Sequence, residues 1–237
     1  MKKILIIGAT SGIGRELALL YAAEGHTIGA TGRRPDLLDS LRREYPDRII
    51  GAVSDAAAPD ADQKLAALTK QMGGLDILIF NAGWGDLSAS LDWAIDRQTV
   101  DINVNAFLTA IHFGWNFFIR QGYGQLVTIS SIAANRGNRH SPAYSAAKSF
   151  QSTYFEGLHI KARKMKLPLY ITDIQPGFVD TKMAKGPRFW VAPPQKAARQ
   201  IVRAIAGKRR RAYITRRWRI IAWLFRWIPG WVYYRLG

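Results

Sequence analysis

ILIIGATSGIGRELALLYAAEG, residues 4–25, is the stretch that decides the fold of this chain. Four apolar residues at 4–7 predict a buried strand, a glycine-rich turn follows at 8–14, and an amphipathic helix begins at Gly12. Glycines let a backbone approach a pyrophosphate, and the N–H groups at a helix start neutralise its charge. The stretch predicts a dinucleotide-binding turn. Its spacing is G-x-x-x-G-x-G, and a glycine-rich turn without a ligand is the alternative.

Strand and helix patterns alternate along the rest of the chain. Short apolar runs predict strands at 4–7, 26–31, 49–53, 75–80, 125–129, 169–175 and 212–215. Amphipathic runs predict helices at 12–24, 35–45, 60–72, 98–121, 142–166 and 194–206. The alternation predicts an α/β fold with a single Rossmann-type, doubly wound, mostly parallel seven-stranded sheet flanked by helices, over residues 1–215. Ligands of such sheets bind at the carboxyl ends of the strands.

The composition bounds the class of protein. The chain has 237 residues, of which 48% are hydrophobic and 22% are charged, as in ordinary globular proteins. It has no cysteine, which excludes thiol catalysis and disulfide scaffolds, and its four histidines lack metal-ligand spacing, so no metal is expected. The apolar run at 4–7 is too short for a signal peptide, and no stretch reaches the roughly 20 apolar residues that span a bilayer. We therefore expect a cytoplasmic protein.

The end of the second predicted strand concerns the choice of dinucleotide. A carboxylate at this point would accept a hydrogen bond from the ribose 2′-OH of NAD, whereas arginine accommodates the 2′-phosphate of NADP. The strand is followed by Gly32-Arg33-Arg34, with no carboxylate before Asp36 and with Arg15 just past the glycine turn. These residues favour NADP(H) over NAD(H), and a solvated arginine pair is the alternative.

Several short motifs follow the predicted strands, one after another along the chain. They are the glycine turn, Asn81-Ala82-Gly83, Ser131, Tyr144-x-x-x-Lys148, Pro176-Gly177 and Thr181. Together they resemble the short-chain dehydrogenase/reductase family from residue 4 to about residue 181. One departure is Ala52, which occupies the position of a family aspartate that contacts adenine. This leaves the backbone near Val53 for that contact.

The resemblance implies a catalytic role for four residues. It assigns Tyr144 as the general acid/base and Lys148, four residues further on the same helix face, as the cation that favours tyrosinate. Ser131 would orient the substrate oxygen, with Ser130 as the competing choice. Asn103 would support a water-mediated proton relay, with Asn105 as the alternative.

The resemblance also implies the binding residues. Cofactor contacts are expected at Gly8, Thr10, Ser11, Gly12, Ile13, Gly14, Arg33, Arg34, Val53, Asn81, Ala82, Gly83, Tyr144, Lys148, Pro176, Gly177, Val179 and Thr181. Substrate contacts are expected at Ser131, Trp84, Phe189 and Trp190, and the aromatic lining points to an apolar substrate.

The function that these residues imply is hydride transfer between NADP(H) and a carbonyl or secondary alcohol. Reduction is the favoured direction, and an apolar, lipid-like ketone is the favoured substrate. The resemblance also suggests a homodimer or homotetramer through the helices at 98–121 and 142–166. The alternative function is a non-catalytic NADP-binding module that acts through its C-terminal tail.

The tail differs in charge from the rest of the chain. Residues 181–237 hold 15 of the 34 basic residues and no acidic residue, so the remainder of the chain is nearly neutral. Four of the eight tryptophans lie in the tail, at 218, 223, 227 and 231. A positive charge confined to one end argues against a general nucleic-acid binder.

Residues 216–237 are expected to form an amphipathic appendix. A helix over 214–228 would gather its apolar residues on one side, namely Ile214, Trp218, Ile221, Leu224, Phe225 and Ile228. Arg216, Arg219 and Arg226 would lie opposite. Basic residues with interfacial aromatics favour a helix in a membrane surface. Packing on the catalytic domain or on a partner subunit is the alternative, and nucleic acid is the weakest choice.

Overall fold

A single seven-stranded parallel sheet organises the chain. The computed structural model describes residues 1–88, 90–181 and 189–236. The strands follow the order β3-β2-β1-β4-β5-β6-β7, and every neighbouring pair is parallel. They are β1 (Lys3–Ile7), β2 (Thr27–Gly32), β3 (Ile49–Val53), β4 (Ile77–Phe80), β5 (Gly124–Ile129), β6 (Leu169–Pro176) and β7 (Arg211–Ile214). The predicted doubly wound fold is confirmed.

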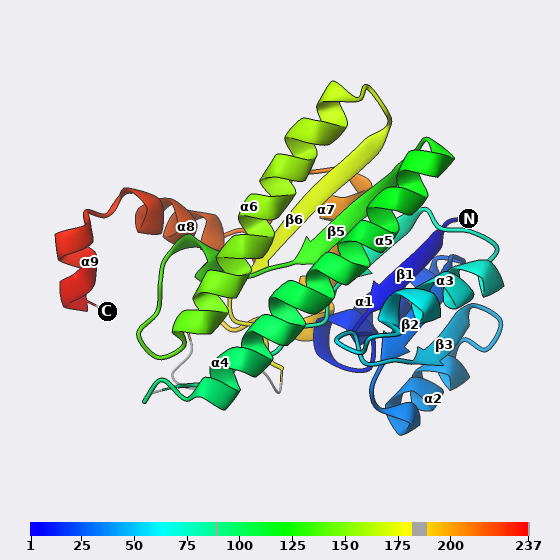
Figure 1. Ribbon diagram of the computed structural model, residues 1–237, viewed down its shortest axis with the longest axis horizontal. Coiled ribbons are helices and arrows are strands. Elements are labelled where there is room, and N and C mark those ends of the chain that lie inside the picture. Colours follow the sequence, from blue (N-terminus) through cyan, green and yellow to red (C-terminus); the bar gives the residue numbers. More distant parts are fainter. Residues whose placement is uncertain (89, 182–188, 237) are drawn as a thin grey trace.

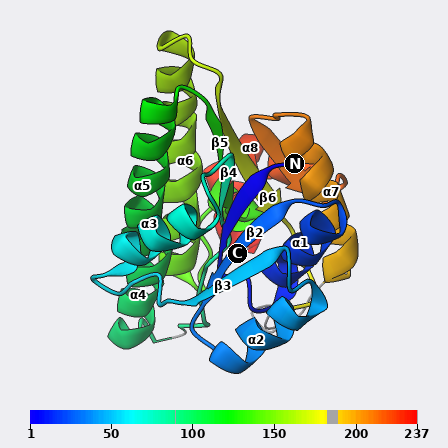
Figure 2. The same ribbon diagram turned by 90° about the vertical axis from the view of Figure 1, so that its right-hand side faces the viewer.

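Helices cover both faces of the sheet (Figure 2). One face carries α1 (Gly12–Ala23), α2 (Pro35–Glu44) and α7 (Pro194–Ala206). The other carries α3 (Ala61–Gln71), α4 (Trp93–Val100), α5 (Ala106–Gln121) and α6 (Pro142–Lys164). Ile4 and Ile6 of β1 belong to the first core, whereas Leu5 and Ile7 belong to the second. Successive side chains of a strand point to opposite faces, which explains why the strands are almost continuously apolar.

The helix predicted at 98–121 is longer and less regular than expected. It begins with α4 at Trp93, because the side chain of Asp92 accepts hydrogen bonds from the N–H groups of Ala94 and Ile95. A π-helical segment, η1 (Asp101–Asn105), then joins α4 to α5. Such segments occur frequently at functional sites. This one contains both of the asparagines considered from the sequence.

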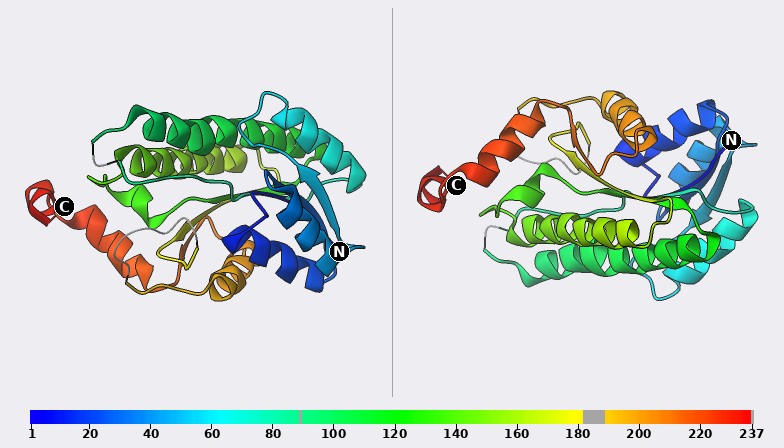
Figure 3. Two further views of the ribbon diagram at one scale, coloured as in Figure 1. Left: turned by 90° about the horizontal axis from the view of Figure 1, so that it is seen from below. Right: turned by 90° about the horizontal axis from the view of Figure 1, so that it is seen from above.

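The tail forms two short helices, α8 (Trp218–Trp227) and α9 (Gly230–Leu236), which extend away from the sheet (Figures 1 and 3). The prediction of one helical face beginning at Ile214 is wrong, because Ile214 ends β7 and is buried in the sheet. Trp218 and Ala222 face the protein and are buried, whereas Leu224, expected on the same face, is exposed. None of the described helices combines the length and the apolarity needed to cross a membrane.

Candidate active site

The loops after β1 and β4 are held in close contact. The two strands are neighbours, while β2 lies on the other side of β1, so the strand order reverses between β1 and β4, which is where ligands of such sheets bind. The Asn81 side chain donates a hydrogen bond to the carbonyl oxygen of Gly8 at 2.7 Å. A Cβ atom at Gly8 would lie 2.7 Å from the Ala82 nitrogen, and one at Gly14 would overlap the Gly8 carbonyl. Glycine is therefore required here by the approach of the two loops.

The start of α1 offers donors for an anion. Its N-cap residue, Ser11, makes no capping hydrogen bond with its side chain, which leaves the first N–H groups of the helix available. Arg34 reaches over the turn and donates to Thr10 Oγ1 at 3.1 Å and to Ser11 Oγ at 2.9 Å. A glycine cradle, a free helix start and a guanidinium fit the pyrophosphate of a dinucleotide and one further phosphate.

The other two arginines near the turn have acidic partners. Arg33 lies 3.9 Å from a carboxylate oxygen of Asp55, and both side chains are about half exposed. Arg15 pairs with Glu44 at 3.0 Å on the surface. Arg34 is thus the arginine that extends over the glycine turn. The exposed side chain of Val53 lies at the end of β3, where the sequence predicted the adenine contact.

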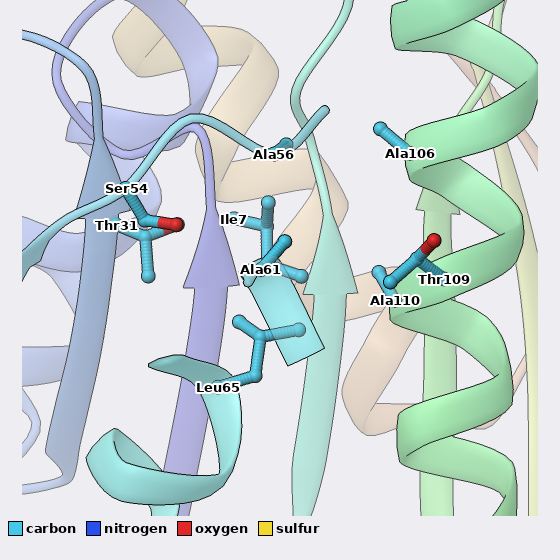
Figure 4. Close-up of a pocket in the computed structure, with 9 residues that line it drawn as sticks. All are labelled: Ile7, Thr31, Ser54, Ala56, Ala61, Leu65, Ala106, Thr109 and Ala110. Carbon is cyan, nitrogen blue, oxygen red and sulfur yellow. The ribbon is translucent and has the colours of Figure 1, made fainter. Parts of the chain in front are cut away.

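A small cavity lies beneath the ends of β1, β2 and β3, lined by Ile7, Thr31, Ser54, Ala56, Ala61, Leu65, Ala106, Thr109 and Ala110 (Figure 4). Its volume of about 10 Å³ suffices for roughly one water molecule. No part of a nucleotide base fits inside it.

Tyr144 and Ser131 meet beyond the end of β5. Ser131 caps the short 3₁₀ helix η2 (Ile132–Asn135), and Tyr144 lies in the first turn of α6, just after Pro142. Burial raises the pKa of Tyr144, and a hydrogen bond with the Ser131 side chain opposes that rise. The loop after β4 covers the tyrosine, since a Cβ atom at Gly85 would overlap its ring.

Lys148 lies one turn further along α6 and is almost fully buried. Its ammonium donates to the Ile129 carbonyl at 3.1 Å and to Gln151 Oε1 at 3.2 Å. Its Nζ atom lies 5.8 Å from the centre of the Tyr144 ring. Burial lowers the pKa of Lys148 to about 7, although the nearby carboxylate of Asp173 acts in the opposite direction.

The structure distinguishes the two candidate serines. Ser130 is buried and turns into the space between β5 and β6, where its hydroxyl donates to Asp173 and contacts the Ile174 carbonyl at 3.1 Å. Ser131, the next residue, turns toward Tyr144. Neighbouring residues of an extended chain point in opposite directions, which explains why only one of the pair reaches the tyrosine.

The structure also distinguishes the two candidate asparagines. Asn103 is fully buried, and its side-chain nitrogen donates to the carbonyls of Thr99 at 2.9 Å and Trp84 at 2.5 Å. It thereby connects η1 to the loop that covers Tyr144. Asn105 is exposed and bonds to Asp101 at 3.0 Å, away from the site.

The segment after β6 lies against the glycine turn. Gly177 donates its N–H to the Ile214 carbonyl at 2.6 Å, and Val179 pairs with Ala192 in an isolated bridge. The segment brings Thr181 to the glycine turn, where a Cβ atom at Gly12 would lie 3.0 Å from its methyl group. Residues 182–188 of the expected substrate loop lie outside the described residues.

An aromatic cluster borders this segment. Phe189 and Trp190 are both partly exposed. Phe189 packs with Phe178 and Trp190, and Trp218 of α8 packs with all three, with ring centroids 5.0–5.9 Å apart. Trp218 also packs on Ile132, the residue after Ser131. The fourth expected substrate residue, Trp84, lies in the loop over Tyr144, bonded to Asn103.

Sequence reasoning missed Gly85, Gln151, Asp173 and Trp218 as members of this site. Two signals were available: Gln151 lies three residues after Lys148 on the same helix, and Asp173 is a carboxylate within an apolar strand. No local pattern links Trp218 to Gly177, whose Cβ atom would overlap the indole ring.

Comparison with known proteins identifies the family of this chain. The family model for short chain dehydrogenases matches residues 2–191. An uncharacterized oxidoreductase of Myxococcus xanthus is 35% identical over 185 residues, covering 76% of this chain and 72% of the relative.

Two solved structures are similar in fold. A short-chain dehydrogenase from Streptomyces avermitilis has a TM-score of 0.82 at 25% identity, over 95% of this chain and 92% of that one. The 3-ketoacyl-(acyl-carrier-protein) reductase from Brucella melitensis, solved in complex with NADH, has a TM-score of 0.81 at 19% identity, over 91% and 98%. The match of the family model and that of the Myxococcus relative mean that this chain belongs to the short-chain dehydrogenase family and is a nicotinamide-dependent oxidoreductase.

Proposed function

We propose that this enzyme uses NADPH to reduce the carbonyl group of an apolar, lipid-like substrate to a secondary alcohol. The observation that carries the proposal is the placement of Ser131 beside Tyr144, with buried Lys148 one turn further on and its Nζ atom 5.8 Å from the centre of the Tyr144 ring. The Tyr144 ring lies against the loop after β4, which Asn81 ties to the glycine turn. The expected cofactor-binding and proton-donating residues therefore lie at the same edge of the sheet.

The proposed chemistry needs a hydride, a proton and a stabilised oxygen. When bound, the nicotinamide supplies the hydride to the carbonyl carbon, and negative charge develops on the oxygen. Ser131 donates a hydrogen bond to that oxygen, and Tyr144 gives it the phenolic proton. The ammonium of Lys148 stabilises the tyrosinate that remains, since an opposite charge nearby favours the ionised phenol.

The preference for NADP(H) over NAD(H) rests on Arg34. Its guanidinium bonds to Thr10 and Ser11 of the glycine turn, and its charge is not paired with a carboxylate among the described residues. A 2′-phosphate would supply that countercharge. Arg33 is a second candidate contact, but it lies beside Asp55.

Arg34→Ala is expected to weaken NADPH binding about tenfold or more and to leave NADH binding nearly unchanged, because a charge-assisted contact to the 2′-phosphate is lost. Fluorescence titration of the purified protein with both nucleotides measures the effect. Arg33→Ala is the matched control, for which a smaller loss is expected. An equal loss for NADH and NADPH would contradict the phosphate-reading role of Arg34.

The aromatic cluster supports an apolar substrate. Phe189 and Trp190, on the segment that follows β6, present exposed carbon-rich surfaces, and the buried Trp218 packs against both of them. Binding pockets for organic ligands combine such surfaces with a few polar anchors, here Ser131 and Tyr144. A long-chain ketone or 3-oxoacyl compound has the matching chemistry.

Surface aromatics on α5 and α6 support a homodimer or homotetramer. Phe113, Trp115 and Phe117 on α5 are only half-buried, and Phe150 and Ile160 on α6 are 37% and 53% exposed. Pairing of these helices with those of a second copy would cover them. Light scattering on the purified protein tests this, and a monomer at micromolar concentration would exclude the assembly.

The tail supports association with an anionic membrane surface at the cytoplasmic side. We call the exposed residues Ile220, Trp223, Leu224, Trp227, Trp231 and Tyr234 the α8–α9 outer face; each is between 45% and 78% exposed. Arg216, Arg217, Arg219, Arg226 and Arg235 lie on the same two helices or just before them, and no acidic residue follows Asp180. Such a surface complements anionic lipid headgroups and partitions its aromatics into the interface. In this proposal the catalytic domain spans residues 1–215, and residues 216–237 form an appendix that packs on it through Trp218 and Ala222.

The Trp223→Ser, Trp227→Ser double variant is expected to bind vesicles at least tenfold more weakly than the native protein, because two interfacial aromatics are lost. Cosedimentation with vesicles of phosphatidylcholine and phosphatidylglycerol measures binding. Added salt should weaken binding of the native protein, since it screens the arginines. Trp93→Ser, which removes an exposed tryptophan of α4, is the control. Equal binding to neutral vesicles in high salt, or no binding at all, would refute the proposal.

A further inference from the structure

Gln151 lies between two residues of the active site. It is fully buried on α6, one turn after Lys148. Its Oε1 atom accepts a hydrogen bond from Lys148 Nζ at 3.2 Å, and its Nε2 atom donates to the main-chain carbonyl of Asn103 at 2.8 Å. The side-chain amide therefore joins the ammonium of α6 to the π-helical segment η1.

The orientation of this amide is determined by its partners. A carbonyl oxygen only accepts hydrogen bonds and an ammonium only donates them, so the amide nitrogen must face Asn103 and the amide oxygen must face Lys148. Asn103 is itself anchored by bonds from its side chain to Thr99 and Trp84. The Gln151 oxygen that accepts from Lys148 is thus held in place by a series of hydrogen bonds, which begins at Trp84 in the loop that covers Tyr144 and continues through Asn103.

The family resemblance implies a water-mediated relay at Asn103. In this chain a protein side chain bonds directly to both Lys148 and the main-chain carbonyl of Asn103. We propose that Gln151 is a positioning residue that connects these two residues through its amide and holds Lys148 as a cation near Tyr144. The inference rests on the proposed role of Lys148 in the reductase.

The charged and titratable groups around Lys148 come from three elements. Tyr144 lies on the same helix, and the carboxylate of Asp173 approaches from β6. Arg211 of β7 lies 3.3 Å from that carboxylate and shares it. Since Asp173 is also bonded to Ser130, Ser152 and Gln175, its charge is distributed among several donors. The neutral oxygens of Gln151 and Ile129 are then the direct acceptors of the ammonium.

Two variants, Gln151→Leu and Gln151→Ser, test whether Gln151 acts through its hydrogen bonds or only by filling space. Leucine fills the site but offers no acceptor, whereas serine leaves room for a water that can bond to both Lys148 and Asn103. Titration of the ¹³Cε signal of labelled lysine reports Lys148 directly, with its signal assigned as the one lost in Lys148→Arg. The measurement needs neither cofactor nor substrate.

We expect the titration midpoint of Lys148 to fall by about one pH unit in Gln151→Leu, because the cation loses an acceptor while its burial persists. In Gln151→Ser the midpoint should stay within about half a unit of the native value. Gln151→Glu, which keeps the shape and adds a negative charge, should raise the midpoint and serves as the second variant if leucine prevents folding. An unchanged midpoint in Gln151→Leu and Gln151→Glu would overturn the inference.

Gln125→Leu is the matched control. Gln125 is also a buried glutamine, with bonds to Thr172 and to the Ile205 carbonyl, but it lies in β5 away from Lys148. Its substitution should lower the melting temperature without moving the Lys148 midpoint, and an equal shift would show a global effect that contradicts the proposal. NADPH titration of the same samples tests the proposed function separately. If the Lys148 midpoint shifts in Gln151→Leu but the native protein does not bind NADPH, Gln151 remains the partner of Lys148 and the proposed reductase function is refuted.

Discussion

Tyr144→Phe is expected to lower the rate of carbonyl reduction by about 10²–10⁴-fold, the range lost when a general acid is removed. The phenolic hydroxyl is the proton donor in the proposed reaction, and phenylalanine keeps the ring that fills the space under Gly85. The fold and the nucleotide-binding loops should therefore be unaffected. NADPH affinity is expected to change less than about threefold, since one hydrogen bond at most is lost.

The experiment follows NADPH oxidation with a panel of medium- and long-chain ketones. Tyr154→Phe is the matched control, because Tyr154 lies on the same helix and its hydroxyl contacts His112 at 3.1 Å on the outer surface. Only Tyr144→Phe should lose activity. Undiminished NADPH oxidation in Tyr144→Phe would refute the role of Tyr144 as the proton donor. If the native protein binds NADPH but oxidises none of it with any carbonyl tested, the non-catalytic alternative, a nucleotide-binding module that acts through its tail, becomes the better description.

Trp218→Ala is expected to lower the free energy of unfolding by about 3–5 kcal/mol, the usual cost of truncating a buried tryptophan. The indole is 2% exposed and packs against Gly177, Phe178, Phe189 and Ile132. Its N–H has no hydrogen-bond partner among the described residues, so the loss would come from packing. The substitution should also weaken substrate binding, because the cluster borders the proposed pocket.

Equilibrium unfolding in urea measures this change. Trp223→Ala, five residues later on the same helix, is the matched control: its side chain is 61% exposed, and a change within about 0.5 kcal/mol is expected. A loss below about 1 kcal/mol in Trp218→Ala would mean that α8 contributes little to the catalytic domain. The two variants thus separate the inner face of α8, which packs on the active-site segment, from the α8–α9 outer face.

Much of the architecture follows from local patterns. The alternation of apolar runs and amphipathic stretches predicted the seven parallel strands, most of them to within a residue at either end. The glycine turn could be recognised because a strand, Gly8, Gly12 and Gly14, and a helix follow one another within a short segment. The i, i+4 spacing of Tyr144 and Lys148 likewise predicted that they share one side of α6, as they do.

The interruption of the helix at 98–121 could not be predicted in this way. Its early start depends on Asp92, which is a capping residue by type. The π-helical segment contains Asn103, whose side chain bonds to Trp84, 19 residues away in the chain, and no local pattern predicts that contact. The tail was misjudged for a similar reason. The expected apolar face included Ile214 and Leu224. Ile214 instead pairs with β6 as the last residue of β7, and Leu224 is exposed.

The sequence by itself therefore determined the fold class, the family and the loops in which the chemistry lies, because these depend on residues close together in the chain. The tertiary structure decided which of several equivalent side chains reach the site: Arg34 over the glycine turn, Ser131 toward Tyr144, Gln151 between Lys148 and Asn103, and Trp218 against Gly177. The physical reason is that such contacts join segments far apart in sequence. Burial on two faces makes a strand recognisable locally, but the direction of a single side chain depends on which distant segment packs against it.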